Sequence, residues 1–261
     1  MTFRDKVVFV AGGTTGINFG IAESFAEAGA RVAVLSRSQE RVDAAVAELK
    51  RHGGDVIGFA ADVRDYDALS SAMASTAAQL GAIDVLISGA AGNFVAPASE
   101  LSANGFKAVI DIDLLGCFNV MRAAYDHLRK PGAAIINISA PQSWLPTPFQ
   151  IHVGAAKAGI DQVTRTAAIE WGPQGIRVNA IAPGPIAGTE GMRRLAPTPA
   201  AEKAWTDSVP LRRWGSKAEI ARAAQWLCSD DAAYVTGVVL PVDGGWSLGG
   251  SSAMTTAVTA R

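Results

Sequence analysis

Short apolar runs alternate with longer amphipathic segments along the chain. Seven of the apolar runs have the length and composition of buried strands, at residues 7–11, 31–36, 56–61, 84–90, 134–139, 177–182 and 238–242. Between them, segments such as IAESFAEAG and ERVDAAVAELKRHGG repeat apolar residues at helical spacing, and the second ends in a glycine stop. Because such alternation is typical of a parallel sheet with helices on both faces, the pattern predicts an α/β fold with a doubly wound parallel sheet.

The pattern continues without an internal linker, repeat or low-complexity block, which predicts a single domain over residues 1–261. The longest irregular stretch runs from Pro183 to about Pro210 and is rich in Gly, Pro and Thr. Because irregular stretches of this length in a compact domain are usually functional, we expect a substrate loop at about 183–210. The residues from about Gly249 onward are expected to form a tail that is either flexible or docked on a partner.

The composition narrows the function classes. Hydrophobic residues make up 49% of the 261 residues and charged residues 18%, which argues against disorder. A formal net charge of −1 gives no reason to expect nucleic acid as a partner. Two distant cysteines, Cys117 and Cys228, indicate neither a disulfide framework nor a metal site. With no run long enough to span a membrane, no signal peptide and no peroxisomal Ser-Lys-Leu type ending, we expect a cytoplasmic protein.

A glycine-rich turn, AGGTTGIN at residues 11–18, joins the first predicted strand to a helix. Gly12 and Gly16 allow the backbone to turn tightly and to approach a pyrophosphate, whose charge the helix N-terminus favours. Asn18 replaces the third glycine of the usual pattern, which requires only a slightly wider first helical turn. The strand-turn-helix context predicts a dinucleotide site.

The end of the second predicted strand bears on the choice of cofactor. An NAD site commonly has an acidic residue there, but the sequence reads LSRS. Ser36 and Arg37 supply a hydroxyl and a guanidinium, which suit a 2′-phosphate, although Arg37 could also be a solvated side chain. The sequence therefore favours NADPH. Asp62, which ends the third strand, is placed to meet the adenine.

Several motifs together resemble the short-chain dehydrogenase/reductase family over nearly the whole chain. They are GGTTGIN, SGAAGN (88–93), IINIS, the AAK of 155–157, RVNAIAPGPI (177–186) and LPVDGGW (240–246). The resemblance implies a Rossmann-type sheet of seven strands in the order 3-2-1-4-5-6-7 and a homotetramer. Most members of that family use Asn, Ser, Tyr and Lys for catalysis, and the Tyr protonates a substrate carbonyl oxygen. This chain retains only Lys157, with Val153, Ala140 and Asp113 at the Tyr, Ser and Asn positions.

Three longer runs, at residues 90–113, 150–157 and 170–195, resemble the 2,4-dienoyl-CoA reductases, especially the peroxisomal type. In that subset the positions of Asp113 and Lys157 hold the implicated catalytic pair. Hydride added to the δ-carbon of a dienoyl thioester gives an extended enolate, which needs donors near the thioester oxygen and then a proton at the α-carbon. We expect a water held by Asp113 and Lys157 to deliver that proton. Ser139 and Ser143 are both candidate donors to the thioester oxygen.

Binding positions follow from the glycine-rich turn, the strand ends and the resemblance. The predicted cofactor residues are Gly12, Thr14, Thr15, Gly16, Ile17, Ser36, Arg37, Asp62, Val63, Ala90, Lys157, Pro183, Gly184, Ile186 and Thr189. The predicted substrate residues are Arg64, Phe94, Ser102, Asn104, His152 and Met192. Leu195 and Trp205 are further candidates for an acyl channel, and Arg193 and Arg194 for CoA phosphates. Each could equally be core or solvated surface, and a structural role for His152 is also compatible with the sequence.

The leading functional hypothesis is NADPH-dependent reduction of 2,4-dienoyl-CoA to 3-enoyl-CoA in unsaturated fatty-acid degradation, with an acyl-CoA as the small-molecule substrate and no metal. A second hypothesis keeps the chemistry but changes the substrate to another conjugated enoyl thioester or an enone. A third is a nucleotide-binding pseudoenzyme that acts through its oligomer surface. Retention of both Asp113 and Lys157 argues against the third, because an inactive scaffold has no need of the pair.

Overall fold

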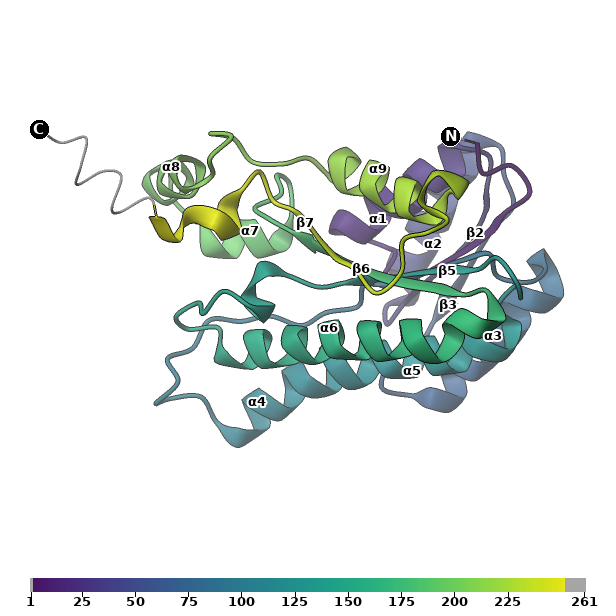
Figure 1. Ribbon diagram of the computed structural model, residues 1–261, viewed down its shortest axis with the longest axis horizontal. Helices are drawn as coiled ribbons and strands as arrows, with labels where there is room; N and C mark the ends of the chain where they lie inside the picture. Colours follow the sequence, from purple (N-terminus) through teal and green to yellow (C-terminus); the bar gives the residue numbers. More distant parts are fainter. Residues whose placement is uncertain (1, 252–261) are drawn as a thin grey trace, which may run out of the picture.

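A seven-stranded parallel sheet forms the centre of the molecule (Figure 1). The computed structural model describes residues 2–251. The strands are β1 (Val7–Ala11), β2 (Arg31–Ser36), β3 (Val56–Ala60), β4 (Val85–Ser88), β5 (Ala134–Ile138), β6 (Arg177–Pro183) and β7 (Val239–Val242). They lie in the order β3-β2-β1-β4-β5-β6-β7, and every neighbouring pair is parallel. The predicted fold class and strand order are confirmed.

Helices cover both faces of the sheet, because alternate side chains of each strand point to opposite faces. Phe9 and Ala11 of β1 pack in one hydrophobic cluster, and Val8 and Val10 pack in the other. The first cluster includes side chains of α3 (Tyr66–Leu80), α5 (Gly116–Ala124) and α6 (Ile151–Trp171). The second includes side chains of α1 (Gly16–Glu27), α2 (Gln39–Leu49) and α9 (Lys217–Cys228). The result is a three-layer arrangement of helices, sheet and helices (Figure 1).

One long helical element carries a π-helical segment in its middle. It begins with α4 (Ala103–Val109), passes through the π segment η2 (Ile110–Leu115) and continues as α5. Ser102 caps its start, where the hydroxyl accepts a hydrogen bond from the Gly105 N–H. π-helical segments are rare and are frequent at functional sites. This segment contains Asp113.

The stretch after β6 differs from the prediction of an irregular loop. It contains two helices, α7 (Glu190–Leu195) and α8 (Pro199–Ser208). Each helix follows a threonine whose hydroxyl accepts a backbone hydrogen bond, Thr189 from Met192 and Thr198 from Ala201. The glycines and prolines of this stretch concealed these caps, so the expectation of irregular structure was wrong for residues 190–195 and 199–208.

Short 3-10 helices complete the described chain: η1 (Lys50–His52), η3 (Tyr125–His127), η4 (Pro141–Ser143), η5 (Gly172–Gln174), η6 (Asp230–Ala232) and η7 (Trp246–Ser251). The predicted tail from about Gly249 begins within η7, and its remainder lies outside the described residues. Within residues 2–251, none of the helices combines the length and apolar character that crossing a membrane requires.

Candidate active site

A groove of about 380 Å³ lies at the carboxyl ends of the first strands. Parallel sheets of this type commonly bind nucleotides at that edge. Eleven of the predicted cofactor residues line the groove: Gly12, Thr14, Thr15, Gly16, Ile17, Ser36, Arg37, Asp62, Val63, Ala90 and Thr189. The structure therefore brings most of the predicted cofactor residues together.

The glycine-rich turn forms the floor of this groove. Gly12 has a φ of +75°, and a Cβ there would lie 3.0 Å from the backbone of Ala90. Helix α1 begins at Gly16, and its N-cap Thr15 makes no side-chain cap hydrogen bond. The first N–H groups of a helix have no partner within it, and together with the helix dipole they favour an anion such as a pyrophosphate.

Two arginines stand at the end of the groove that β2 forms. Arg37 and Arg41 both line it and are exposed, and neither guanidinium has an ion pair or hydrogen bond within residues 2–251. Arg41 was missed in the sequence analysis. Ser38 caps α2 by accepting from the Arg41 N–H, which places Arg41 in the first turn beside Arg37. Two cations next to the Ser36 hydroxyl fit a 2′-phosphate, so the residues present suit NADPH.

Asp62 lies in the same groove but already has a partner. Its two carboxylate oxygens accept hydrogen bonds from the Arg64 side chain at 3.0 and 2.7 Å, and one also accepts from the Arg64 N–H at 2.9 Å. These hydrogen bonds with Arg64 lower the pKa of Asp62, so its carboxylate stays ionised. The guanidinium of Arg64, predicted to bind substrate, is therefore directed to Asp62.

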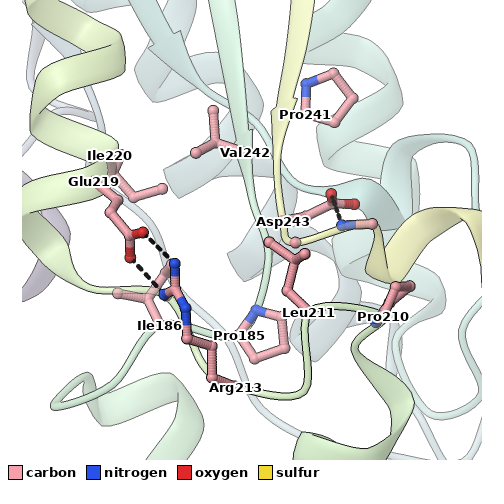
Figure 2. Close-up of a pocket in the computed structure, with 13 residues that line it drawn as sticks. Pro185, Ile186, Pro210, Leu211, Arg213, Glu219, Ile220, Pro241, Val242 and Asp243 are labelled. Atoms are coloured by element: carbon pink, nitrogen blue, oxygen red, sulfur yellow. Dashed lines mark hydrogen bonds and ion pairs between the residues drawn. The ribbon is translucent and has the colours of Figure 1, made fainter.

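The other four residues predicted to bind the cofactor do not line the groove among the described residues: Lys157, Pro183, Gly184 and Ile186. Ile186 instead lines a second hollow of about 510 Å³, together with Ile220 and Val242 (Figure 2). The charged side chains there are already engaged. Arg213 donates two hydrogen bonds to Glu219, and Asp243 accepts from the N–H groups of Gly245 and Ser247. This second hollow therefore has the character of apolar packing rather than of an anion site.

The predicted catalytic residues Asp113 and Lys157 form a buried ion pair. Lys157 Nζ lies 3.1 Å from Asp113 Oδ2, and the two residues are 6% and 1% exposed. Asp113 Oδ1 accepts a hydrogen bond of 2.7 Å from the Gly92 N–H, and Lys157 Nζ donates one of 3.0 Å to the Ile138 carbonyl. Both partners are therefore held from two sides. Neither Gly92 nor Ile138 was predicted as a contact of the pair.

The substrate-side residues surround the loop after β4. The ring of Phe94 packs on the ring of His152, with centroids 4.4 Å apart. His152 is fully buried and its Nε2 lies 3.1 Å from the Phe94 carbonyl oxygen. A direct contact between His152 and a substrate would therefore require this loop to move. Asn104 is exposed on α4, and Ser102 serves as the cap of that helix.

Helices α7 and α8 carry the remaining substrate candidates. Met192 is buried, and the Trp205 indole N–H donates to the Leu195 carbonyl. Arg193 and Arg194 both form ion pairs with Glu190. The hydrogen bonds that Arg193 and Arg194 donate to Glu190 lower the pKa of its carboxyl group. Arg194 also donates to the Asn93 carbonyl, which joins this substrate-side segment to the loop after β4.

Comparison with known proteins identifies the family. A family model described as enoyl-(acyl carrier protein) reductase matches residues 11–247. The chain is 48% identical over 244 residues to the peroxisomal 2,4-dienoyl-CoA reductase [(3E)-enoyl-CoA-producing] of Rattus norvegicus, with 93% of this chain and 84% of the relative covered. The chain belongs to the short-chain dehydrogenase/reductase family.

Two bacterial relatives agree with this assignment. A Bacillus subtilis protein assigned as a 2,4-dienoyl-CoA reductase [(2E)-enoyl-CoA-producing] is 41% identical over 243 residues, covering 92% of this chain and 96% of the relative. The crystal structure of a short chain dehydrogenase from Bacillus anthracis has a TM-score of 0.82 and 40% identity, covering 93% and 96% of the two chains.

Membership of the short-chain dehydrogenase/reductase family gives position 153 its significance. Val153, at the position of the usual tyrosine, is buried in a small apolar cluster with Val109 and Ala156. A valine side chain has no proton to donate. A reaction that protonates the substrate therefore needs a donor other than residue 153.

Ala140 stands at the position of the usual serine, and the nearby Ser139 and Ser143 differ in whether their hydroxyl groups have a hydrogen-bond partner. The Ser139 hydroxyl is buried and donates to Asp161 at 2.5 Å. The Ser143 Oγ is buried but has no hydrogen-bond partner within residues 2–251. Of the two predicted donors, only Ser143 has a hydroxyl without a hydrogen-bond partner within residues 2–251.

Cys117 is buried near the Asp113–Lys157 pair. Burial raises the pKa of its thiol to about 11, so the thiol stays protonated at neutral pH.

Proposed function

We propose that this chain is an NADPH-dependent 2,4-dienoyl-CoA reductase that forms 3-enoyl-CoA in unsaturated fatty-acid degradation. The buried Asp113–Lys157 ion pair supports this most directly, because it stands beside a Val153 that cannot protonate a ketone. An extended enolate can accept its proton from a water, so it does not need the tyrosine. The rat and Bacillus subtilis relatives, both reductases of 2,4-dienoyl-CoA by name, support the same substrate class.

NADPH bound in the groove would supply the hydride to the δ-carbon. The residues of the chain then act on the substrate enolate. Lys157 has three N–H donors; one donates to the Ile138 carbonyl. Asp113 Oδ2 lies 3.1 Å from Lys157 Nζ but has no hydrogen-bond partner within residues 2–251, so two donors are available for a ribose hydroxyl and a water. Asp113 holds that water near the α-carbon and balances the ammonium charge. The uncommitted Ser143 hydroxyl donates to the thioester oxygen, where negative charge develops.

The acyl-CoA substrate would enter from the side of Phe94 and helix α7. The Phe94 ring is partly exposed and offers an apolar wall, with buried Met192 as a further part of that side. Ser102 and Asn104 lie at the start of α4 near this loop, since a Cβ built on Gly105 would lie 3.2 Å from the Phe94 ring. The cations Arg64 and Arg194 each have a carboxylate partner and would need to exchange it to bind CoA phosphates.

The proposal extends to the whole protein as a single domain that works in the cytoplasm as a homotetramer. The relatives include proteins named as peroxisomal and a bacterial protein whose name carries no location. Exposed apolar side chains on α5 and α6, including Phe118 and Ile169, support association with further copies. A pseudoenzyme receives no support, because the ion pair and the groove residues are both retained.

Turnover with 2,4-hexadienoyl-CoA and 2,4-decadienoyl-CoA, followed by NADPH oxidation beside a panel of ketones and secondary alcohols, tests the function. We expect dienoyl-CoA turnover and poor activity on the panel. NMR of the product distinguishes protonation at the α-carbon, which gives 3-enoyl-CoA, from the 2-enoyl product named for the Bacillus subtilis relative. Brisk turnover of ketones without dienoyl-CoA activity would defeat the proposal, and activity on other enones alone would favour the second hypothesis.

Cofactor preference is tested separately. Arg37→Ala and Arg41→Ala should each weaken NADPH binding by about 1–3 kcal/mol, the scale of charge-assisted hydrogen bonds, and leave NADH binding unchanged. Arg51→Ala is the matched control, since Arg51 pairs with Glu48 outside the groove. Calorimetry measures the dissociation constants. Equal constants of the wild-type protein for NADPH and NADH would contradict the proposed role of Ser36 and Arg37.

A further inference from the structure

The segment of residues 89–94, here called the strap, connects β4 to the substrate side of the site. It has no regular secondary structure. The Gly92 N–H of the strap donates a hydrogen bond of 2.7 Å to Asp113 Oδ1. The other carboxylate oxygen of Asp113, Oδ2, lies 3.1 Å from Lys157 Nζ. The orientation of the Asp113 carboxylate therefore depends on where the strap holds Gly92.

Two buried side chains from the start of α6 hold the far end of the strap. Gln150 Nε2 donates to the Phe94 carbonyl at 3.2 Å, and His152 Nε2 lies 3.1 Å from the same oxygen. Because a carbonyl oxygen only accepts, this second contact requires the imidazole proton on Nε2. Gln150 is 3% exposed and His152 is 0% exposed. One carbonyl of an irregular segment thus receives two buried donors.

Neither side chain has another polar partner within the described chain. Gln150 Oε1 and His152 Nδ1 are both buried without a hydrogen bond. Burying such atoms unpaired is unfavourable, and an apolar pair would fill this space without that cost. Within residues 2–251, the contact with the Phe94 carbonyl is the one polar interaction that either of these side chains makes.

The near end of the strap is held independently. Asn18 Nδ2 donates to the Gly89 carbonyl at 2.7 Å, which ties the start of the strap to the glycine-rich turn. Ala90, which lines the nucleotide groove, follows directly. The strap is thus held at Gly89 from the nucleotide side and at Phe94 from α6, and exposed Arg194 also donates to the Asn93 carbonyl at 3.2 Å. Gly92, the residue that donates to Asp113, lies between these points.

We infer that Gln150 and His152 are positioning residues, which orient the Asp113 carboxylate through the Phe94 carbonyl and the strap. The inference rests on the proposed function, because it concerns the proton delivered by the Asp113 water. Loss of both donors frees the Phe94 carbonyl, the strap moves, and the Gly92 N–H no longer fixes Asp113. A displacement of about 1 Å in a catalytic group, caused by a substitution far from the reacting atoms, can lower the rate by about 100-fold.

The test uses five variants of the 261-residue chain. Gln150→Leu and His152→Leu each remove one donor, and the double variant removes both. His152→Gln returns an Nε2 donor and serves as the conservative variant. Gln162→Leu is the control, because it makes the same exchange on an exposed face of α6. Single-turnover reduction of 2,4-hexadienoyl-CoA, NADPH affinity and the solvent deuterium isotope effect are measured for each.

We expect a small loss for each single variant, because one donor remains, and a loss of about 10- to 100-fold in the single-turnover rate of the double variant. The solvent isotope effect should rise as proton delivery becomes slower. NADPH affinity should stay unchanged because Asn18 still holds the start of the strap. His152→Gln should recover the wild-type rate, and the control should match wild type. A wild-type rate and isotope effect in the double variant would overturn the inference.

Amide hydrogen exchange of residues 89–94 gives a readout that does not depend on activity. Faster exchange at Gly92 in the single and double variants supports the inference, and unchanged exchange in both single variants overturns it even should the double variant fail to fold. Absence of dienoyl-CoA turnover by the wild-type protein is a different outcome. It defeats the proposed function, while the exchange measurement still decides whether Gln150 and His152 hold the strap.

Discussion

At the scale of single residues, the site is dominated by two opposite charges that lie buried side by side. Removal of one partner of such a pair leaves an uncompensated charge, which commonly costs about 3–5 kcal/mol. Asp113 is also held by Gly92, and Lys157 by Ile138, so neither side chain can easily turn to another partner. This arrangement restricts the orientations that the carboxylate and the ammonium can adopt.

The first prediction concerns the proton. Asp113→Ala should slow the chemical step by about 10²–10⁴-fold, the usual scale for a general acid/base group. Lys157→Ala should lower both the rate and NADPH affinity, because the ammonium is also expected to bind the ribose. The double variant should lose little more than the worse single variant, since residues that act as a unit are not additive. Single-turnover kinetics and calorimetry measure these effects.

Asp113→Asn separates folding from chemistry in this experiment, because an amide oxygen can still accept from Gly92. Val153→Tyr should not restore activity to the Asp113 variants, since position 153 packs against Val109 and Ala156 and lacks space for a phenol. Near-normal turnover by Asp113→Ala, with chemistry shown to limit the rate, would contradict the water relay and leave Val153 unexplained.

A second prediction at the residue scale concerns the packing of Gly89 against the side chain of Asn18. A Cβ on Gly89 would overlap the side-chain amide of Asn18. Gly89→Ala should therefore destabilise the protein by about 1–3 kcal/mol, the range for overpacking, and lower NADPH affinity. Asn18→Ala removes the obstructing atoms, so the double variant should recover most of the stability. Urea denaturation of the four proteins gives the coupling energy, and additive effects would contradict this packing.

The pairing of Asp113 with Lys157 could be predicted from the sequence, because a motif fixed both positions. The partners Gly92 and Ile138 could not, since their contacts depend on the backbone path of irregular segments. The position of Arg41 in the groove could have been predicted from the sequence, because the Ser38 cap places this residue in the first turn of α2. Ile186 was assigned from its motif, whereas its side chain faces a second apolar hollow (Figure 2).

At the scale of elements, buried strands were the easiest to predict. The predicted ranges 7–11 and 31–36 match β1 and β2, and the range 56–61 exceeds β3 by one residue. Continuous β-branched and apolar runs of this length are what a fully covered parallel sheet requires. Helices α7 and α8 were missed because they are short and follow glycines and prolines. The π segment around Asp113 has no sequence signal of its own.

Helix α9 provides a prediction with a pH dependence. Ser216 and Glu219 form a capping box at its start, and Arg213 donates two hydrogen bonds to Glu219. The Arg213 hydrogen bonds, and then the Ser216 N–H, lower the pKa of Glu219 to about 2. A carboxyl group whose pKa is lowered on folding stabilises the folded state above its unfolded pKa. That stabilisation is lost as pH falls from about 4.5 towards about 2.

Glu219→Gln should therefore lower the free energy of unfolding at pH 7 by about 0.5–1 kcal/mol, because solvent screens this exposed pair. The difference from wild type should shrink as pH falls through that window. Glu40→Gln is the control, since Glu40 lies in the first turn of α2 without an ion pair in the described chain. Urea denaturation at several pH values measures the effect. A difference that is constant with pH would mean that ionisation of Glu219 contributes nothing.

At the scale of the whole molecule, the sheet order brings distant segments to one edge. The turns after β1, β2, β3 and β4 line the groove, and the strap carries contacts from there to α6. The layer beyond the sheet that contains α5 and α6 leaves large apolar side chains uncovered. Leu115 is 45% exposed, Phe118 is 50% exposed and Ile169 is 78% exposed.

These side chains are the basis of the last prediction. Exposed apolar surface on adjacent helices is typical of a protein interface, and symmetric assembly of identical chains is the commonest way to cover it. Analytical ultracentrifugation should therefore find the wild-type protein at four times the chain mass of 27.0 kDa.

The double substitution Phe118→Glu and Ile169→Glu should reduce that mass, because two carboxylates would have to be buried in each interface. Tyr234→Glu is the control, since Tyr234 is fully exposed outside both helices. A wild-type monomer would contradict the homotetramer, and an unchanged assembly of the double variant would place the interface on another face.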